Sequence, residues 1–115
     1  MATTFTSTEL TKFGSEVVAT TWATLDNGET GDALEFCGSG DRSAQVTGTF
    51  GAAVTIEGSN DGTTYFTLTD PQGNAISMTA NGLEQIMEIT RFIRPKKGAA
   101  AGTVKVVIFT RFARK

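Results

Sequence analysis

The sequence predicts an all-β protein, an antiparallel two-sheet sandwich that is jelly-roll-like, with about eight strands and an extended N-terminal arm. Short runs of β-branched and aromatic residues recur about every ten residues, and clusters of Gly, Asn and Asp separate them. Thirteen glycines stand against two prolines, and no long run has a helical period. With 115 residues, one domain is expected, divided into an arm over residues 1–14 and a sandwich over residues 15–115.

The arm is predicted from its composition. Residues 1–14 are mostly polar and contain two isolated aromatic side chains, Phe5 and Phe13. Such a segment gains little by folding back on its own domain, so we expect it to become ordered when a partner buries the two rings. An edge strand or a frayed terminus is the alternative.

The first half of the sandwich is expected to contain strands over residues 16–25, 33–37 and 42–50. Within the first of these, alternation places four side chains on one face: Val18, Thr20, Trp22 and Thr24. Trp22 is therefore assigned to the core. The alternation over 42–50 is typical of a sheet with one face in water.

Residues 44–68 give the clearest local signal and are interpreted as three strands joined by two turns. Apolar side chains recur at period two in 54–58 and 65–68. Between them, Ser59-Asn60-Asp61-Gly62 supplies residues that tolerate positive φ, which predicts a β-hairpin. Downstream, Asp70-Pro71-Gln72-Gly73 fits a type I turn, with Asp first, Pro second and Gly fourth.

The last third is expected to hold strands over residues 75–79, 83–94 and 103–112, with a flexible basic connector over 95–102. The run 83–94 fits a helical face as well as a strand, but its Ile, Thr and Phe residues and the lack of a capping box favour a strand. One side of the final strand carries Val104, Val106, Ile108, Thr110 and Phe112. The other side carries Lys105, Val107, Phe109 and Arg111. This mixture of charged and large apolar side chains suggests either that the strand twists from the interior to the exterior or that this side is a contact surface.

Residues suited to catalysis or metal binding are scarce. There is no histidine and Cys37 is the only cysteine, which removes the usual general base, the Ser/His and Cys/His pairs and a cysteine zinc site. Asp61 and Asp70 could form a carboxylate pair or a calcium site across the hairpin. We favour their interpretation as turn residues that cap backbone amides. No enzyme activity, cofactor or metal is therefore expected.

Charge is distributed unevenly along the chain. Residues 1–90 contain all twelve acidic side chains and two basic ones, whereas residues 91–115 contain eight basic side chains and no acidic one. Such clustering is compatible with nucleic-acid binding, but strands from both parts must interleave, so we expect part of the charge to pair across strands. Contact with an acidic protein surface, or between copies, is favoured over nucleic acid.

The candidate contact residues combine the arm and the basic set: Phe5, Phe13, Arg91, Arg94, Lys96, Lys97, Arg111, Arg114 and Lys115. A solvated edge is the alternative for the basic set. No apolar run approaches the roughly 20 residues of a membrane span, so no membrane partner is expected. The first residues lack the basic and apolar blocks of a secretory signal, which predicts synthesis in the cytoplasm.

A resemblance adds a function. Residues 43–51, 54–62 with Leu68, 70–74 and Ile93-Arg94-Pro95 resemble a group of small tailed-bacteriophage virion proteins. The likeness spans roughly residues 42–110 and consists mostly of residues that are typical of turns. It implies a β-sandwich capsid decoration, or cement, protein on the outside of the virion. Its implied partners are the major capsid protein and further copies of itself, as dimers or trimers.

A second similarity concerns the same hairpin. Residues 57–62, followed by Tyr65 and by Arg94-Pro95 downstream, are similar to discoidin-like, galactose-binding jelly rolls. This likeness implies glycan binding through loops at one end of the sandwich. The chain departs from that pattern, with tyrosine in place of the usual tryptophan and no flanking disulfide. A glycan-binding module is therefore one alternative function, and a head-fibre or tail component, in which similar small sandwiches occur, is the other.

Overall fold

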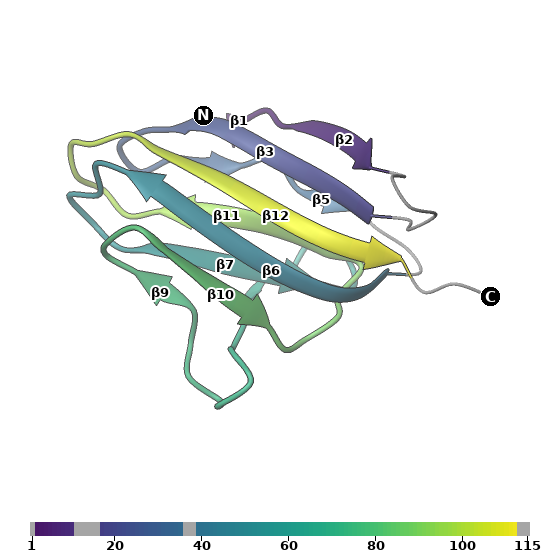
Figure 1. The fold of residues 1–115 in the computed structure, drawn as a ribbon. Helices are drawn as coiled ribbons and strands as arrows, with labels where there is room; N and C mark the ends of the chain where they lie inside the picture. The colour runs from purple at the N-terminus through teal and green to yellow at the C-terminus, as the bar shows by residue number, and fades with distance from the viewer. Residues whose placement is uncertain (1, 11–16, 36–38, 113–115) are drawn as a thin grey trace.

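The computed structural model describes residues 2–10, 17–35 and 39–112, which form two sheets packed face to face (Figure 1). This confirms the predicted all-β, two-sheet sandwich of jelly-roll-like form. Twelve strands are found in the described residues, more than the eight expected, because several strands have only two residues. No helix long and apolar enough to cross a membrane occurs in the described part of the chain.

The seven-stranded sheet has the order β1 (Ala2–Thr3), β4 (Thr30–Gly31), β11 (Phe92–Lys97), β7 (Val54–Ser59) and β8 (Phe66–Thr67). Two further strands join it, β5 (Leu34–Glu35) against β11 and β9 (Ser77–Met78) against β7. The five-stranded sheet has the order β10 (Gly82–Ile86), β6 (Ser39–Gly48), β12 (Val104–Phe112), β3 (Val17–Leu25) and β2 (Thr6–Leu10). All pairs are antiparallel except β1 with β4.

The core lies between the sheets, where the alternating apolar side chains of each strand meet. On β12, Val104, Val106 and Ile108 are buried, as the period-two pattern predicts. Trp22 is fully buried, and its indole Nε1 donates a hydrogen bond to the Asp32 carbonyl oxygen at 3.0 Å. The indole therefore contributes a large apolar area without leaving its N–H unpaired.

A β-bulge changes the phase of β3. Trp22 lies opposite Val106 and Leu25 lies opposite Val104, so three steps on β3 match two steps on β12. The extra residue turns Leu25 into the core and leaves Thr24 exposed. The prediction that Thr24 shares the inner face with Trp22 is wrong for this reason.

The described part of the N-terminal segment, residues 2–10, does not form a free arm. Strand β1 pairs with β4, and β2 pairs along the edge of β3. Phe5 is half-buried, with its ring centroid 5.4 Å from that of Trp22. Backbone pairing and ring burial within the chain replace the partner that was expected to order this segment, as the edge-strand alternative requires. Phe13 lies outside the described residues.

The β7–β8 hairpin is confirmed, with Glu57 opposite Thr67 and Gly58 opposite Phe66. The type I turn is supported by the Gly73 amide, which donates to the Asp70 carbonyl oxygen at 2.9 Å. The preceding strand β6 does not extend this hairpin, because it lies in the other sheet. The chain crosses between sheets after Gly48, which has a φ of 134°.

The run 83–94 is not a single strand. It divides into β10 of the five-stranded sheet and β11 of the seven-stranded sheet, and residues 87–91 cross between them. Pro95, Lys96 and Lys97 continue β11 instead of forming a flexible connector, with Pro95 opposite Ile56. Side-chain hydrogen bonds at Glu88 and Thr90 hold the crossing and interrupt the strand.

Candidate binding surfaces

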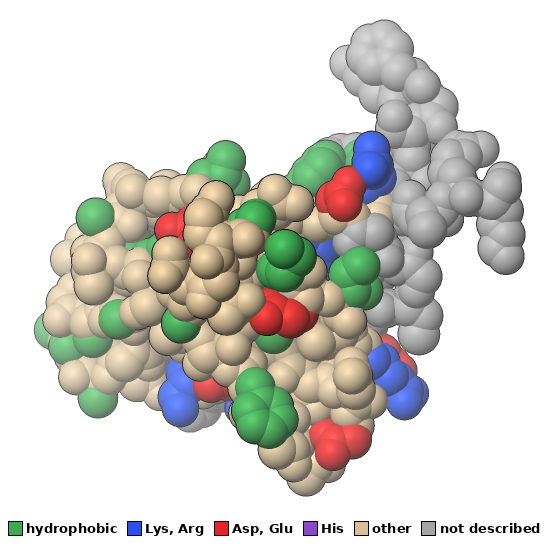
Figure 2. Space-filling view, turned by 90° about the horizontal axis from the view of Figure 1, so that it is seen from below, with side chains coloured by type: hydrophobic (Ala, Val, Ile, Leu, Met, Phe, Trp, Pro, Cys, Tyr) green, Lys and Arg blue, Asp and Glu red, His purple; other side chains and the backbone are tan. Residues whose placement is uncertain are grey.

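Three of the predicted contact arginines form ion pairs with acidic side chains from elsewhere in the chain. Arg91 lies 2.6 Å from Glu35 and Arg94 lies 3.0 Å from Glu57. The third pair joins Arg111 to Asp41. The expected pairing of charge between the two parts of the sequence is confirmed. In Figure 2, most of the visible Lys and Arg side chains likewise lie beside Asp or Glu.

Arg94 has a second contact. Its guanidinium carbon lies 3.6 Å above the centre of the Tyr65 ring, close enough for a cation–π interaction. Tyr65 belongs to the hairpin and Arg94 to β11, so the contact holds the end of the hairpin against the outer face of the seven-stranded sheet. Arg94 therefore has a structural role, whatever else it binds.

The predicted lysine contacts separate in the structure. Lys96 is exposed on β11, whereas Lys97 is fully buried and its Nζ donates to the Ala100 carbonyl oxygen at 2.7 Å. Lys97 cannot reach a partner and is removed from the contact set, because its strand position points it into the sandwich. Arg114 and Lys115 lie outside the described residues.

The outer face of the five-stranded sheet carries a surface without charge. Two cross-strand rows, each spanning all five strands, make up this "uncharged face". The first row is Leu83, Gln45, Val107, Thr21 and Thr6. The second row is Gln85, Ser43, Phe109, Ala19 and Thr8. Leu83 is 65% exposed and Phe109 is 42% exposed, which is unusual for such large apolar side chains.

The sequence indicated part of this face. Val107 and Phe109 were assigned to a side of the last strand that suggested a contact surface. The sequence does not indicate Leu83, because its pattern predicts one strand over 83–94, whereas the pairing of Leu83 with β6 depends on the crossing at 87–91. A hollow of about 320 Å³ opens at the Phe109 end and is also lined by Asp41, Gln85 and Arg111.

A second candidate surface is a groove of about 450 Å³ at one end of the sandwich. It is lined by residues 58–61, 64, 66–68, 88 and 90, and we name it the loop groove. One side comes from the β7–β8 hairpin and the other from the crossing segment 87–91. Gly58 of β7 lies against the crossing segment, where a Cβ on it would come within 2.6 Å of the Thr90 hydroxyl oxygen. Figure 2 shows the molecule from below, with separate hydrophobic and acidic side chains among other side chains and backbone.

Asp61 organises the hairpin loop through one carboxylate oxygen. Its Oδ1 accepts hydrogen bonds from the Thr64 amide at 2.9 Å, the Thr63 amide at 2.8 Å and the Ser59 hydroxyl at 2.8 Å. These bonds, led by that from Thr64, lower the pKa of Asp61 to about 2. Asp70 similarly accepts from the Gln72 and Asn74 amides. The interpretation of both residues as turn caps is confirmed.

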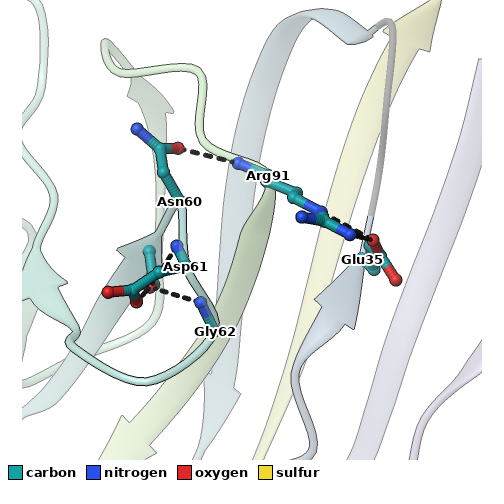
Figure 3. Close-up of polar contacts among 6 residues, drawn as sticks. Glu35, Asn60, Asp61, Gly62 and Arg91 are labelled. Atoms are coloured by element: carbon teal, nitrogen blue, oxygen red, sulfur yellow. Dashed lines mark hydrogen bonds and ion pairs between the residues drawn. The ribbon is translucent and has the colours of Figure 1, made fainter.

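The same loop is tied to the crossing segment 87–91 and, through it, to β5, as Figure 3 shows. The Asn60 side-chain oxygen accepts from the Arg91 amide at 3.1 Å, and the Arg91 side chain reaches Glu35 on β5. A loop held at both its backbone and its side chains presents its exposed atoms in a fixed arrangement.

Glu88 supplies the second carboxylate of the loop groove. Burial raises its pKa, but hydrogen bonds from the Thr69 hydroxyl and the Thr69 amide outweigh that effect, so the pKa is lowered overall. Asp61 and Glu88 are thus both ionised at neutral pH. The described residues contain no group of three acidic or cysteine side chains placed to hold a metal ion. The chemistry available in the groove is hydrogen-bond acceptance beside an aromatic ring, that of Phe66.

No family model and no curated protein matches this chain. Among solved structures, it is similar to the cupin domain of Schizosaccharomyces pombe Cnp3, with 12% identity, a TM-score of 0.44 and coverage of 95% of this chain. The chain spans 60% of the length of that structure. A cupin domain from Bordetella pertussis Tohama I gives 12% identity, a TM-score of 0.42 and coverage of 99% and 98% of the two chains. The likeness concerns the fold alone.

Proposed function

We propose that this protein is a non-enzymatic structural protein of a tailed-bacteriophage virion, which decorates and stabilises the capsid shell. Its partners are the major capsid protein and further copies of itself, and its place is the capsid exterior. The resemblance over residues 42–110 supports this function. The confirmed turns at 59–62 and 70–73 carry much of that resemblance.

The observation that carries the proposal is the uncharged face. Ten neighbouring positions on five strands lack a charged side chain in a protein whose residues are 19% charged. The centres of protein interfaces are depleted of charge and enriched in aromatic residues, as Phe109 provides here. A face that spans five strands suits contact with an extended, regular surface such as a shell.

Affinity need not be high at each site. On a shell, each contact is made beside many others, and copies joined to one another bind at high effective concentration. Dimers or trimers that span capsomer junctions would therefore reinforce a shell by many modest contacts.

The basic residues take a secondary place in this proposal. Arg91, Arg94 and Arg111 each pair with an acidic side chain of the same chain, which leaves less charge for a partner. Exposed Lys96 stays a candidate for orienting the molecule, since surface charge influences association rate and register more than affinity.

Co-sedimentation with purified shells tests the proposal, using shells assembled from the major capsid protein of the genome that encodes this chain. Wild-type protein is expected to sediment with the shells, and Phe109→Glu is expected to stay in the supernatant because it places a charge on the central strand of the face. Ser77→Glu, on exposed β9 of the other sheet, is the matched control and should bind as wild type does. Equal binding by all three proteins would reject the uncharged face as the contact.

Of the alternative functions, a glycan-binding module would use the loop groove, and a head-fibre or tail component is the other. The groove and the uncharged face share no residue. The two functions can therefore coexist in one virion protein.

A further inference from the structure

We propose that the loop groove binds a neutral sugar ring, with Phe66 as the stacking platform and the Asp61 and Glu88 carboxylates as acceptors for the sugar hydroxyls. This inference does not depend on capsid decoration, because it concerns different residues. It rests on the glycan-binding alternative of the proposed function, to which it gives a defined site and a defined class of ligand.

Phe66 has the geometry of a stacking platform. At 69% exposure it is the most exposed large hydrophobic side chain in the described part of the protein. Its cross-strand neighbour on β7 is Gly58, which has no side chain to cover the ring. Strand β8 is the last in the order of the sheet, so no strand in that order pairs with its other edge. The C–H face of a sugar ring is an apolar surface of the right size to cover such an exposed ring.

The two carboxylates supply the complementary polar contacts. In the described residues, the hydrogen bonds to the Asp61 side chain all go to Oδ1, which leaves Oδ2 for a ligand. Figure 3 shows one oxygen of this carboxylate turned away from the loop backbone. Glu88 is held by two bonds from Thr69 and retains further lone pairs. Ionised carboxylates accept hydroxyl protons strongly, and a sugar offers several of these.

The loop is already in place before any ligand arrives. Asp61 is fixed by three hydrogen bonds, and Asn60 is fixed to the Arg91 backbone. Less conformational freedom is then lost on binding, which favours a weak ligand such as a single sugar. The exposed hydroxyls of Thr64 and Thr67 add groups that both donate and accept.

Charge and size select the class of ligand. Two ionised carboxylates repel phosphates, sulfates and acidic sugars, so the ligand is not an anion. The described residues offer no three-ligand cluster for a metal, and the mixture of hydroxyls and carboxylates does not suit an apolar peptide. A volume of about 450 Å³ lies within the usual range of small-molecule sites and accommodates one or two sugar rings.

The test is a chemical-shift titration of the 15N-labelled full chain with galactose, glucose and N-acetylglucosamine, each added separately, and with sialic acid as the acidic comparison. At least one neutral sugar should shift the amides of residues 59–67 and 88–90 and leave those of β3 unchanged. Phe66→Ala should weaken that binding about tenfold or more, whereas Phe109→Ala, which truncates an exposed ring elsewhere, should not. Asp61→Asn should weaken binding with the loop still folded.

The proposal is overturned if none of the neutral sugars shifts the groove amides, if sialic acid binds in their place, or if Phe66→Ala binds as tightly as Phe109→Ala. Co-sedimentation with shells separates this result from the function proposed above. Phe66→Ala should still bind shells. Loss of shell binding by Phe66→Ala, without any sugar binding by the wild type, would make the groove a shell contact and would also overturn the sugar site.

Discussion

Arg42, on the inner side of β6, donates hydrogen bonds to both oxygen atoms of Thr90, in the segment that crosses between the sheets. Its Nη1 lies 3.4 Å from the Thr90 hydroxyl, and its Nη2 bonds the Thr90 carbonyl. That hydroxyl in turn donates to the Phe92 carbonyl oxygen at 2.7 Å. Arg42 is almost fully buried, and this desolvation lowers its pKa. The pair fixes the point at which the chain leaves one sheet for the other.

Arg42→Ala should therefore lower the free energy of unfolding by about 2–4 kcal/mol, through loss of charged hydrogen bonds and of packed volume. Thr90→Val should cost about 1–3 kcal/mol, since it leaves a buried donor of Arg42 without that acceptor. Arg111→Ala, which removes an exposed ion pair, is the control and should cost about 1 kcal/mol or less. Urea unfolding measures all three. An Arg42→Ala protein as stable as Arg111→Ala would contradict this role.

Gly31 is predicted to be essential for packing around the indole. A Cβ at this position would lie 2.6 Å from Trp22 Cδ1 and 2.8 Å from Pro95 Cδ, too close for real atoms. Gly31→Ala should lower the free energy of unfolding by about 1–3 kcal/mol, because Trp22 must shift in a filled core. Gly82→Ala is the matched control, since the nearest atoms to its Cβ lie at 3.7 Å. Thermal unfolding that shows equal effects for both variants would refute the close packing.

The pKa of about 2 for Asp61 predicts a pH-dependent contribution to stability. Because this value is below that of an unfolded aspartate, about 3.9, the contribution is fully present above pH 4 and is lost as the pH falls through 2. Asp61→Asn should be less stable than wild type at pH 7, and the difference in melting temperature should shrink steadily between pH 4 and pH 2. A difference that stays constant over this range would show that ionised Asp61 does not hold the loop.

Buried Lys97 predicts contrasting effects of two substitutions. Lys97→Met keeps the volume and removes a charge that must be desolvated, so the free energy of unfolding should change by less than about 1 kcal/mol or rise. Lys97→Ala leaves a cavity next to the Ala100 carbonyl and should cost about 2–4 kcal/mol. Urea denaturation distinguishes the two. A strongly destabilised Lys97→Met protein would mean that the ammonium group itself is required.

The features that could be predicted from the sequence are the ones set by local chemistry. The hairpin at Ser59–Gly62 and the turn at Asp70–Gly73 depend on residues that are close in the chain, and both are present. The bulge at β3 depends on its pairing with β12, which no period in residues 16–25 reveals. The crossing at 87–91 depends on Arg42, more than forty positions earlier. The sheet to which β6 and β10 belong therefore cannot be predicted from the local sequence.

The candidate surfaces, like the sheets, depend on pairing between distant residues that the local sequence does not reveal. The basic residues after position 90 look like one patch in the sequence, but the register places Glu35, Glu57 and Asp41 beside them. The uncharged face can be recognised only from the register that aligns its five strands. The loop groove requires Phe66 and Glu88 to meet from different segments. In each case the deciding information is a pairing between distant residues.

Cryo-electron microscopy of shells mixed with this protein tests the proposed function most directly. The account predicts density for the sandwich on the outside of the shell, with the five-stranded sheet toward the capsid protein and Leu83 and Phe109 within the contact. Shells that carry no such density at saturating protein, or density in which this sheet faces solvent, would contradict it.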